Sequence, residues 1–207
     1  MLTRQGRPSL AEGIALGLIA TGAVSVAIGA VVAVASAAFE VFGAAPTVSM
    51  PVHDVQLTAL DDVPGVSAAT VDSALVTVPA MAGGARWMLL LETALPALAT
   101  VALCAGVWWL GVSLIRSRPF RTSLGWMFGI AACLMIAGSL FGQLAGGIGR
   151  AMIVQDLADS EPGVEDVLWT LLVPFDLAPV GWAFALALIA GLFEIGRRLQ
   201  RDTEGLV

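Results

Sequence analysis

Glu92 is the charged residue with the clearest chemical potential, because it stands in an apolar run about five residues, or about 7 Å of helix, beyond Trp87. A carboxylate at membrane depth is costly and is a functional candidate by default. Pro96 lacks the N–H that would bond the carbonyl of residue 92, which predicts a kink and a free carbonyl at the same level. Gln143 is expected at a similar depth on another helix, about seven residues from the outer end of that helix at Arg150. Glu92, Gln143 and Arg150 could form one hydrogen-bonded cluster that serves as a ligand or ion site. The alternative is that Glu92 is simply paired or reaches the outer interface.

Asp176 is a second carboxylate in an apolar context, between Pro174 and Pro179. The prolines predict a broken helix near 173–179, and Asp176 is suited to cap the helix that follows. The alternative is that Asp176 and Glu92 face one outward vestibule. Capping is the favoured interpretation.

The remaining reactive side chains do not form a catalytic or metal-binding set. His53 is the only histidine, and its aspartate neighbours do not match a metal-ligand spacing. Cys104 and Cys133 lie inside apolar runs, where packing is their expected role. No metal, no cofactor and no enzymatic activity are therefore predicted.

The elements that must position these residues are membrane-spanning helices. The 207-residue chain is 58% hydrophobic and 13% charged, with a mean hydropathy of +0.90, whereas about a quarter of a soluble domain is charged. Four apolar runs each exceed the roughly 20 residues that a spanning helix needs, at about 10–39, 87–115, 122–149 and 168–196. The predicted fold is an all-α polytopic membrane protein in which residues 1–207 form a single four-span domain.

The arginines predict the orientation of these spans. Eight lie before the first run, between the second and third, or after the fourth, whereas two lie on the other side. Both termini are therefore expected in the cytoplasm of a bacterium, with the protein in the inner membrane and the loops 44–85 and 150–167 outside. Six of the arginines form a predicted cytoplasmic basic surface, for topology and lipid contact or for a partner: Arg116, Arg118, Arg121, Arg197, Arg198 and Arg201.

The outer loops are expected to form a small extracytoplasmic subdomain. Residues 48–55 and 73–80 are rich in β-branched residues and could pair as a hairpin, with a turn at 62–65. Two strands alone are marginal in water, so they need support from the second loop or from a partner chain. Residues 156–169 of that loop can form a short amphipathic helix, punctuated by Glu161-Pro162-Gly163.

Small residues recur at every fourth position in the first and third runs. This spacing favours close helix packing. The members at the outer half of the membrane predict one close contact between these two helices: Gly29 and Ala33, followed by Ala37, against Gly138, Gly142 and Gly146.

Two stretches carry a family resemblance, namely IRSRPFRTSLGWMFGIAACLM (115–135) and LALIAGLFEIGRRLQRDTEGLV (186–207). With four spans and a long first outer loop, they resemble an uncharacterised family of bacterial four-span inner-membrane proteins, known as a domain of unknown function. Members are often encoded beside a small helix-turn-helix regulator. The resemblance implies a cytoplasmic regulatory partner and supplies no catalytic residues.

These observations favour a non-enzymatic sensor or regulatory component that couples an envelope signal to a cytoplasmic partner. One alternative is a small transporter or transporter subunit that uses Glu92 and Asp176 as a polar pathway. Another is an accessory subunit of a larger membrane complex. The expected partners are the lipid bilayer, a cytoplasmic regulatory protein, and further copies of the chain or a larger complex. Direct nucleic-acid binding is not expected from a chain with a net charge of −6.

Overall fold

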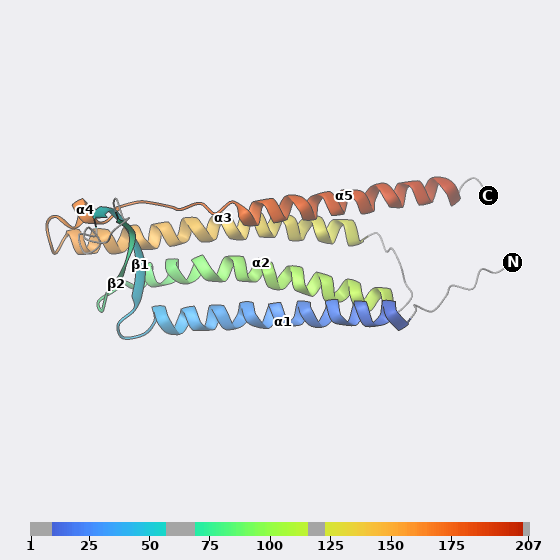
Figure 1. Ribbon diagram of the computed structural model, residues 1–207, viewed down its shortest axis with the longest axis horizontal. Coiled ribbons are helices and arrows are strands. Elements are labelled where there is room, and N and C mark those ends of the chain that lie inside the picture. Colours follow the sequence, from blue (N-terminus) through green and yellow to red (C-terminus); the bar gives the residue numbers. More distant parts are fainter. Residues whose placement is uncertain (1–9, 57–68, 116–122, 205–207) are drawn as a thin grey trace, which may run out of the picture. The chain divides into compact units, whose positions relative to one another are not determined.

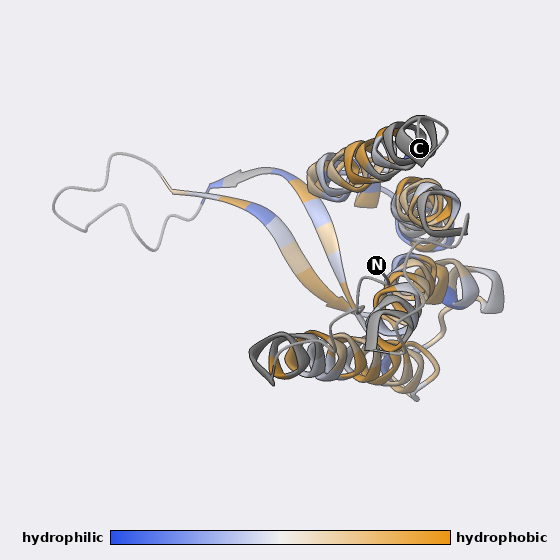
Figure 2. Cartoon of the chain, turned by 90° about the vertical axis from the view of Figure 1, so that its right-hand side faces the viewer, coloured by the Kyte–Doolittle hydropathy of each residue, from blue (hydrophilic) through white to orange (hydrophobic). Residues whose placement is uncertain are grey.

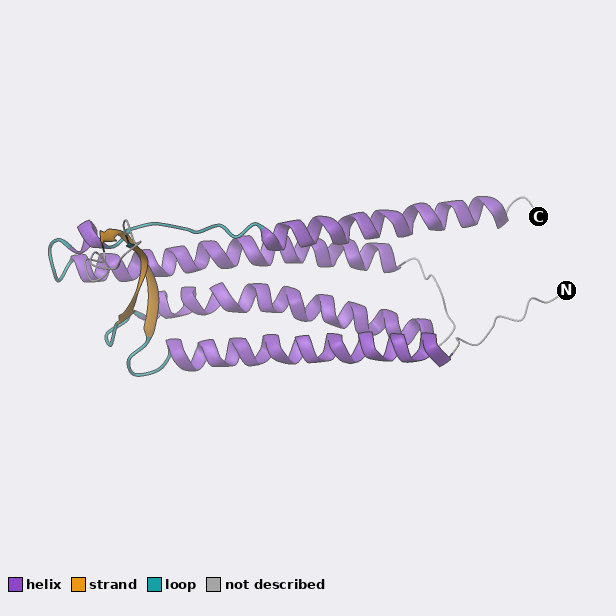
Figure 3. Cartoon of the chain, in the orientation of Figure 1, coloured by secondary structure: helices purple, strands orange, loops and turns teal. Residues whose placement is uncertain are grey.

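Four long helices and a small sheet make up the computed structural model, which describes residues 10–56, 69–115 and 123–204 (Figure 1). The helices are α1 (Leu10–Val41), α2 (Gly83–Ile115), α3 (Ser123–Ala158), the short α4 (Val164–Val167) and α5 (Ala178–Glu204). The strands are β1 (Thr47–Gln56) and β2 (Thr70–Thr77), which lie between α1 and α2 in the chain (Figure 3).

Each long helix contains a segment that is long and apolar enough to cross a membrane. These segments are Gly17–Val41, Gly83–Trp109, Trp126–Ala158 and Ala178–Gly196, with mean hydropathies from 1.8 to 2.4. Apolar residues line all of them (Figure 2), and α1 and α5 leave large side chains such as Leu18 and Leu188 exposed. A helix with so little polar surface needs lipid around it. The prediction of a mostly helical chain with four helices long and apolar enough to span a membrane is confirmed.

Two helix boundaries differ from the prediction. Helix α3 continues to Ala158 instead of ending at 149, because Arg150 finds partners inside the protein and does not mark the end of the helix. Helix α5 begins at Ala178 instead of 168. Pro174 cannot donate a backbone hydrogen bond, whereas Pro179 is accepted in the first turn of a helix.

The chain divides into two compact units, and each is described by itself. We call Val34–Ala94 with Phe141–Phe175 the sheet unit, and Met1–Ala33 with Leu95–Leu140 and Asp176–Val207 the helical unit.

In the helical unit, α3 packs Gly138 against α2. A Cβ atom added at Gly138 would lie 2.8 Å from the carbonyl oxygen of Leu95 and 3.3 Å from the Cβ of Ala99, whereas a Cβ at Gly29 would meet nothing within 4 Å. Ala33 is exposed. The predicted close contact between the first and third helices is therefore wrong for these residues. Helices consecutive in sequence are usually neighbours in space, and here α2 takes the place expected for α1.

In the sheet unit, β1 and β2 pair antiparallel, which confirms the two predicted strands. The register runs from Thr47↔Thr77 to Pro51↔Ser73, is interrupted by an irregularity in β1, and resumes at Val55↔Val71. Strand β2 begins and ends three residues earlier than predicted. The predicted turn at 62–65 lies outside the described residues.

The second loop supports the sheet, as two strands alone require. Val52 of β1 forms a bridge with Leu168, and the N–H of Trp169 donates to the carbonyl of Pro51 at 3.3 Å. A core of buried side chains lies beneath the strands, including Met50, Ile153 and Val154. The amphipathic helix predicted for 156–169 is reduced to the four residues of α4, since the loop's first residues belong to α3 and Gly163 turns the chain with a φ of 98°.

Candidate functional site

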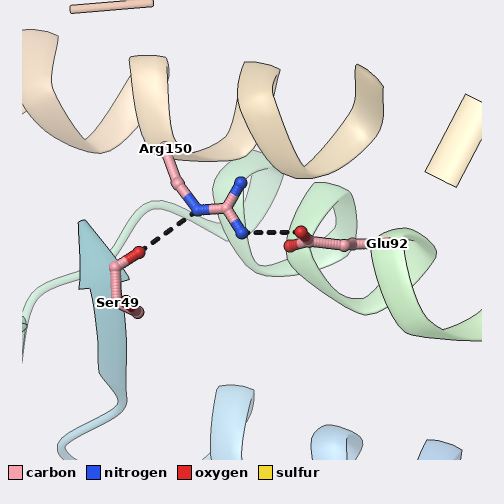
Figure 4. Close-up of polar contacts among 3 residues, drawn as sticks. All are labelled: Ser49, Glu92 and Arg150. Atoms are coloured by element: carbon pink, nitrogen blue, oxygen red, sulfur yellow. Dashed lines mark hydrogen bonds and ion pairs between the residues drawn. The ribbon is translucent and has the colours of Figure 1, made fainter. Parts of the chain in front are cut away.

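Glu92 and Arg150 form an ion pair between α2 and α3. Nη2 of Arg150 lies 2.6 Å from Oε1 of Glu92 (Figure 4). The Arg150 side chain is 18% exposed and that of Glu92 is 30% exposed. A partly buried charge without its partner would be costly, so each of these side chains stabilises the position of the other. Two of the three residues predicted to cluster at this depth are thus brought together.

The same guanidinium reaches the sheet. Nε of Arg150 donates to the carbonyl oxygen of Ser49 in β1 at 3.2 Å (Figure 4). Ser49 stands opposite Leu75 of β2, and its carbonyl is free for Arg150 because it points away from that strand. One side chain of α3 therefore joins β1 and α2.

Gly146 makes room for this arrangement one helical turn before Arg150. A Cβ atom added at Gly146 would overlap the Glu92 carboxylate. Gly149 is also tightly placed, since its added Cβ would lie 3.1 Å from the Cβ of Met88. Gly146 and Gly149 of α3 thus allow α2 and the Glu92 carboxylate to approach closely. The four-residue spacing from Gly146 to Arg150, which places the two on one face of the helix, could have indicated this role for Gly146.

Arg86 is a second anchoring arginine, although its sequence context indicated only on which side of the membrane it lies. Its Nη1 donates to the carbonyls of Val41 and Gly43, each at 3.1 Å, and its Nε donates to the carbonyl of Met81 at 3.2 Å. The last carbonyls of a helix lack intrahelical partners, and a cation near them is favourable. Arg86 thereby ties the end of α1 to the start of α2.

Asp176 caps α5. Its Oδ1 accepts a hydrogen bond from the backbone N–H of Ala178 at 2.9 Å, as the favoured interpretation expects. Asp176 belongs to the helical unit and Glu92 to the sheet unit, so a vestibule shared by the two stays a prediction. Gln143 lies half-buried on α3, two turns before Arg150, and has a polar partner of its own.

The structure does not describe the arginine side chains of the predicted basic surface. Arg116, Arg118 and Arg121 lie outside the described residues, and for the three arginines of α5 only the backbone is described. This surface stays a prediction.

The other reactive side chains form no catalytic set in the described ranges. The ring of His53 stacks on Trp169 with centroids 3.9 Å apart. Cys104 is buried and Cys133 is exposed, and both are free thiols. No group of three or more His, Cys, Asp or Glu residues that could hold a metal ion occurs in residues 10–56, 69–115 and 123–204.

The comparison of the chain with family models, curated proteins and solved structures finds no match. The resemblance to a four-span family therefore stays a prediction, and the meaning of the site rests on its geometry.

Proposed function

We propose that this chain is a non-enzymatic sensor or regulatory component of a membrane, in which Arg150 couples the sheet to the helices. The supporting observation is the shared guanidinium, which holds the Ser49 carbonyl of β1 and the Glu92 carboxylate of α2. A signal that displaces β1 would change how well Arg150 neutralises Glu92. The unbalanced charge would then shift α2 against α3, which is the kind of two-state element that signalling requires.

The arginine distribution supports a location in the bacterial inner membrane. In this arrangement both termini are cytoplasmic and the sheet lies outside, where it meets envelope signals. The six cytoplasmic arginines then face the interior and offer a surface for a partner of acidic character. The family resemblance favours a small helix-turn-helix regulator as that partner.

The transport alternative receives less support from the site. A transport pathway uses a polar group that is free to exchange partners, whereas the Glu92 carboxylate is held by Arg150 at 2.6 Å. If neither a co-purified regulatory protein nor transport activity is found, the chain is best explained as an accessory subunit of a larger membrane complex.

Two assays separate these functions. The chain is purified in mild detergent, with and without residues 199–207, and the captured proteins are tested for DNA binding. A regulatory function predicts that a DNA-binding protein co-purifies with the full chain and is lost when residues 199–207 are removed. The amount of this protein that co-purifies should change in Arg150→Met but not in the exposed control Glu161→Gln. A flux in proteoliposomes that disappears in Glu92→Gln would contradict this function and favour transport.

A further inference from the structure

The backbone of β2 turns half of its hydrogen-bonding groups away from β1. The N–H of Val78 donates to the carbonyl of Pro46 at 3.0 Å, so the alternation of an antiparallel ladder makes Val76 and Ala74 the next hydrogen-bonded residues of β2. The residues that alternate with them, Ser73 and Leu75, are opposite Pro51 and Ser49.

The hydrogen bonds made by the carbonyl groups of β1 agree with this alternation. The carbonyls of Ser49 and Pro51 accept from Arg150 and Trp169 and are therefore directed away from β2. The N–H and C=O groups of Ser73, Leu75 and Thr77 must then face the free edge of β2. Val71 packs against the core together with Ala74 and Val76, so the edge-facing set is limited to Ser73, Leu75 and Thr77.

In the described part of the chain this edge has no partner strand, and Asp72 is the one charged residue of β2. No residue within the described ranges bonds the edge-facing backbone groups of β2. The strand, TVDSALVT, contains no proline, lysine or arginine, the residues with which proteins commonly block edge pairing. Leu75 is 77% exposed beside the edge. An open edge with an exposed leucine is suited to the addition of another strand.

We propose that β2 pairs antiparallel with β2 of a second copy of this chain, with Ala74 on the two-fold axis. In this register Ser73 of each copy faces Leu75 of the other. The two edge-facing residues at the centre of each strand, Ser73 and Leu75, are then paired across the axis. Asp72, the only charged residue of β2, faces Val76 of the other copy, so that no like charges are opposed.

The direction of the sheet fits two copies in one membrane. Within the sheet unit, the strands run across the helix axes (Figure 1), and a view along the helices shows the strands side by side (Figure 2). The two-fold axis of an edge-to-edge sheet is normal to the sheet, and it is therefore roughly parallel to the helices. Two copies with the same topology satisfy this condition, which favours a second copy over a soluble strand as the occupant.

Cysteine cross-linking tests the register. Ala74→Cys is placed in a chain that also carries Cys104→Ala and Cys133→Ala, and membranes are oxidised with copper phenanthroline. Residues on the axis form a non-hydrogen-bonded pair within disulfide reach. The matched control is Asp72→Cys, whose copies would be separated by four residues of strand, or about 13 Å. We expect at least about fivefold more cross-linked homodimer for Ala74→Cys than for Asp72→Cys.

A second variant blocks the edge alone. Ser73→Pro removes an N–H that faces the edge and leaves the ladder with β1 intact, so it should abolish the Ala74→Cys cross-link. A disulfide within one chain between Ser49→Cys and Leu75→Cys, measured in the same Ser73→Pro background, checks that β1 and β2 remain paired. Equal cross-linking at positions 72 and 74, its absence at 74, its persistence in Ser73→Pro with the strands paired, or a cross-link to a different protein would overturn the proposal.

Discussion

Arg150 and Glu92 are coupled through a charge-assisted hydrogen bond, and that coupling can be measured. The free energy of unfolding is compared for Glu92→Gln, Arg150→Met and the double variant, in mixed detergent micelles. We expect a coupling energy of about 1–2 kcal/mol, with Arg150→Met the more destabilising single change because it also loses the Ser49 carbonyl. The exposed Glu161→Gln should change stability by less than about 0.5 kcal/mol. Additive single variants would contradict the pairing.

Gly146 provides a steric test of the same site. Gly146→Ala should destabilise the protein by about 1–3 kcal/mol, because the new methyl group would displace the Glu92 carboxylate from Arg150. The matched control is Gly129→Ala on the same helix, where an added Cβ meets nothing within 4 Å. The control should be neutral or stabilising, since alanine favours a helix by up to about 1 kcal/mol. Thermal unfolding in one detergent checks both, and equal effects would argue against a seat for Glu92 at Gly146.

The sequence predicted only part of this site, for a physical reason. Glu92 and Arg150 could be identified because charges in apolar runs are costly and must find partners. The Ser49 carbonyl could not be identified, because a backbone acceptor has no signature in the side chains. Gly146 was recognised as a packing residue but was assigned to the wrong neighbour, since spacing along one helix does not say which helix lies against it.

At the scale of elements, the beginning of α5 depends on Asp176. Asp176→Ala should remove the bond to the Ala178 N–H and destabilise the helix start by about 1 kcal/mol. Asp176→Asn keeps an acceptor oxygen and should retain most of this stability. Hydrogen exchange of the first turn of α5 measures the difference. Equal exchange in the alanine variant and the unmodified chain would contradict the capping role.

Elements were predicted better than their boundaries. Long apolar runs indicate helices because a bilayer requires internal backbone hydrogen bonds, and the β-branched segments identified both strands. The end of α3 was missed because Arg150 was taken as an interfacial residue, whereas its charge is neutralised within the protein. The start of α5 was missed because apolar residues at 168–177 have the composition of a span while two prolines interrupt them.

At the scale of the whole molecule, the proposed orientation makes opposite predictions for its two ends. A single cysteine at Ser160, between α3 and α4, should react with a membrane-impermeant maleimide in intact cells. A single cysteine at Thr203, near the C-terminus, should react only after permeabilisation, because the arginine distribution places that end in the cytoplasm. Both variants are made without Cys104 and Cys133. The reverse labelling pattern would contradict the proposed topology and place the sheet inside the cell.

The central claim is that Arg150 connects the sheet to the helices, and hydrogen exchange of β1 tests it most directly. Exchange in lipid nanodiscs is compared between the unmodified chain and Glu92→Gln, which alters α2 and leaves every β1 residue in place. The account predicts faster exchange across Thr47–Gln56, because Arg150 without its carboxylate holds the Ser49 carbonyl less firmly, and unchanged exchange in α5. Exchange of β1 that is identical in the two proteins would show that the sheet does not respond to the ion pair, and would contradict the account.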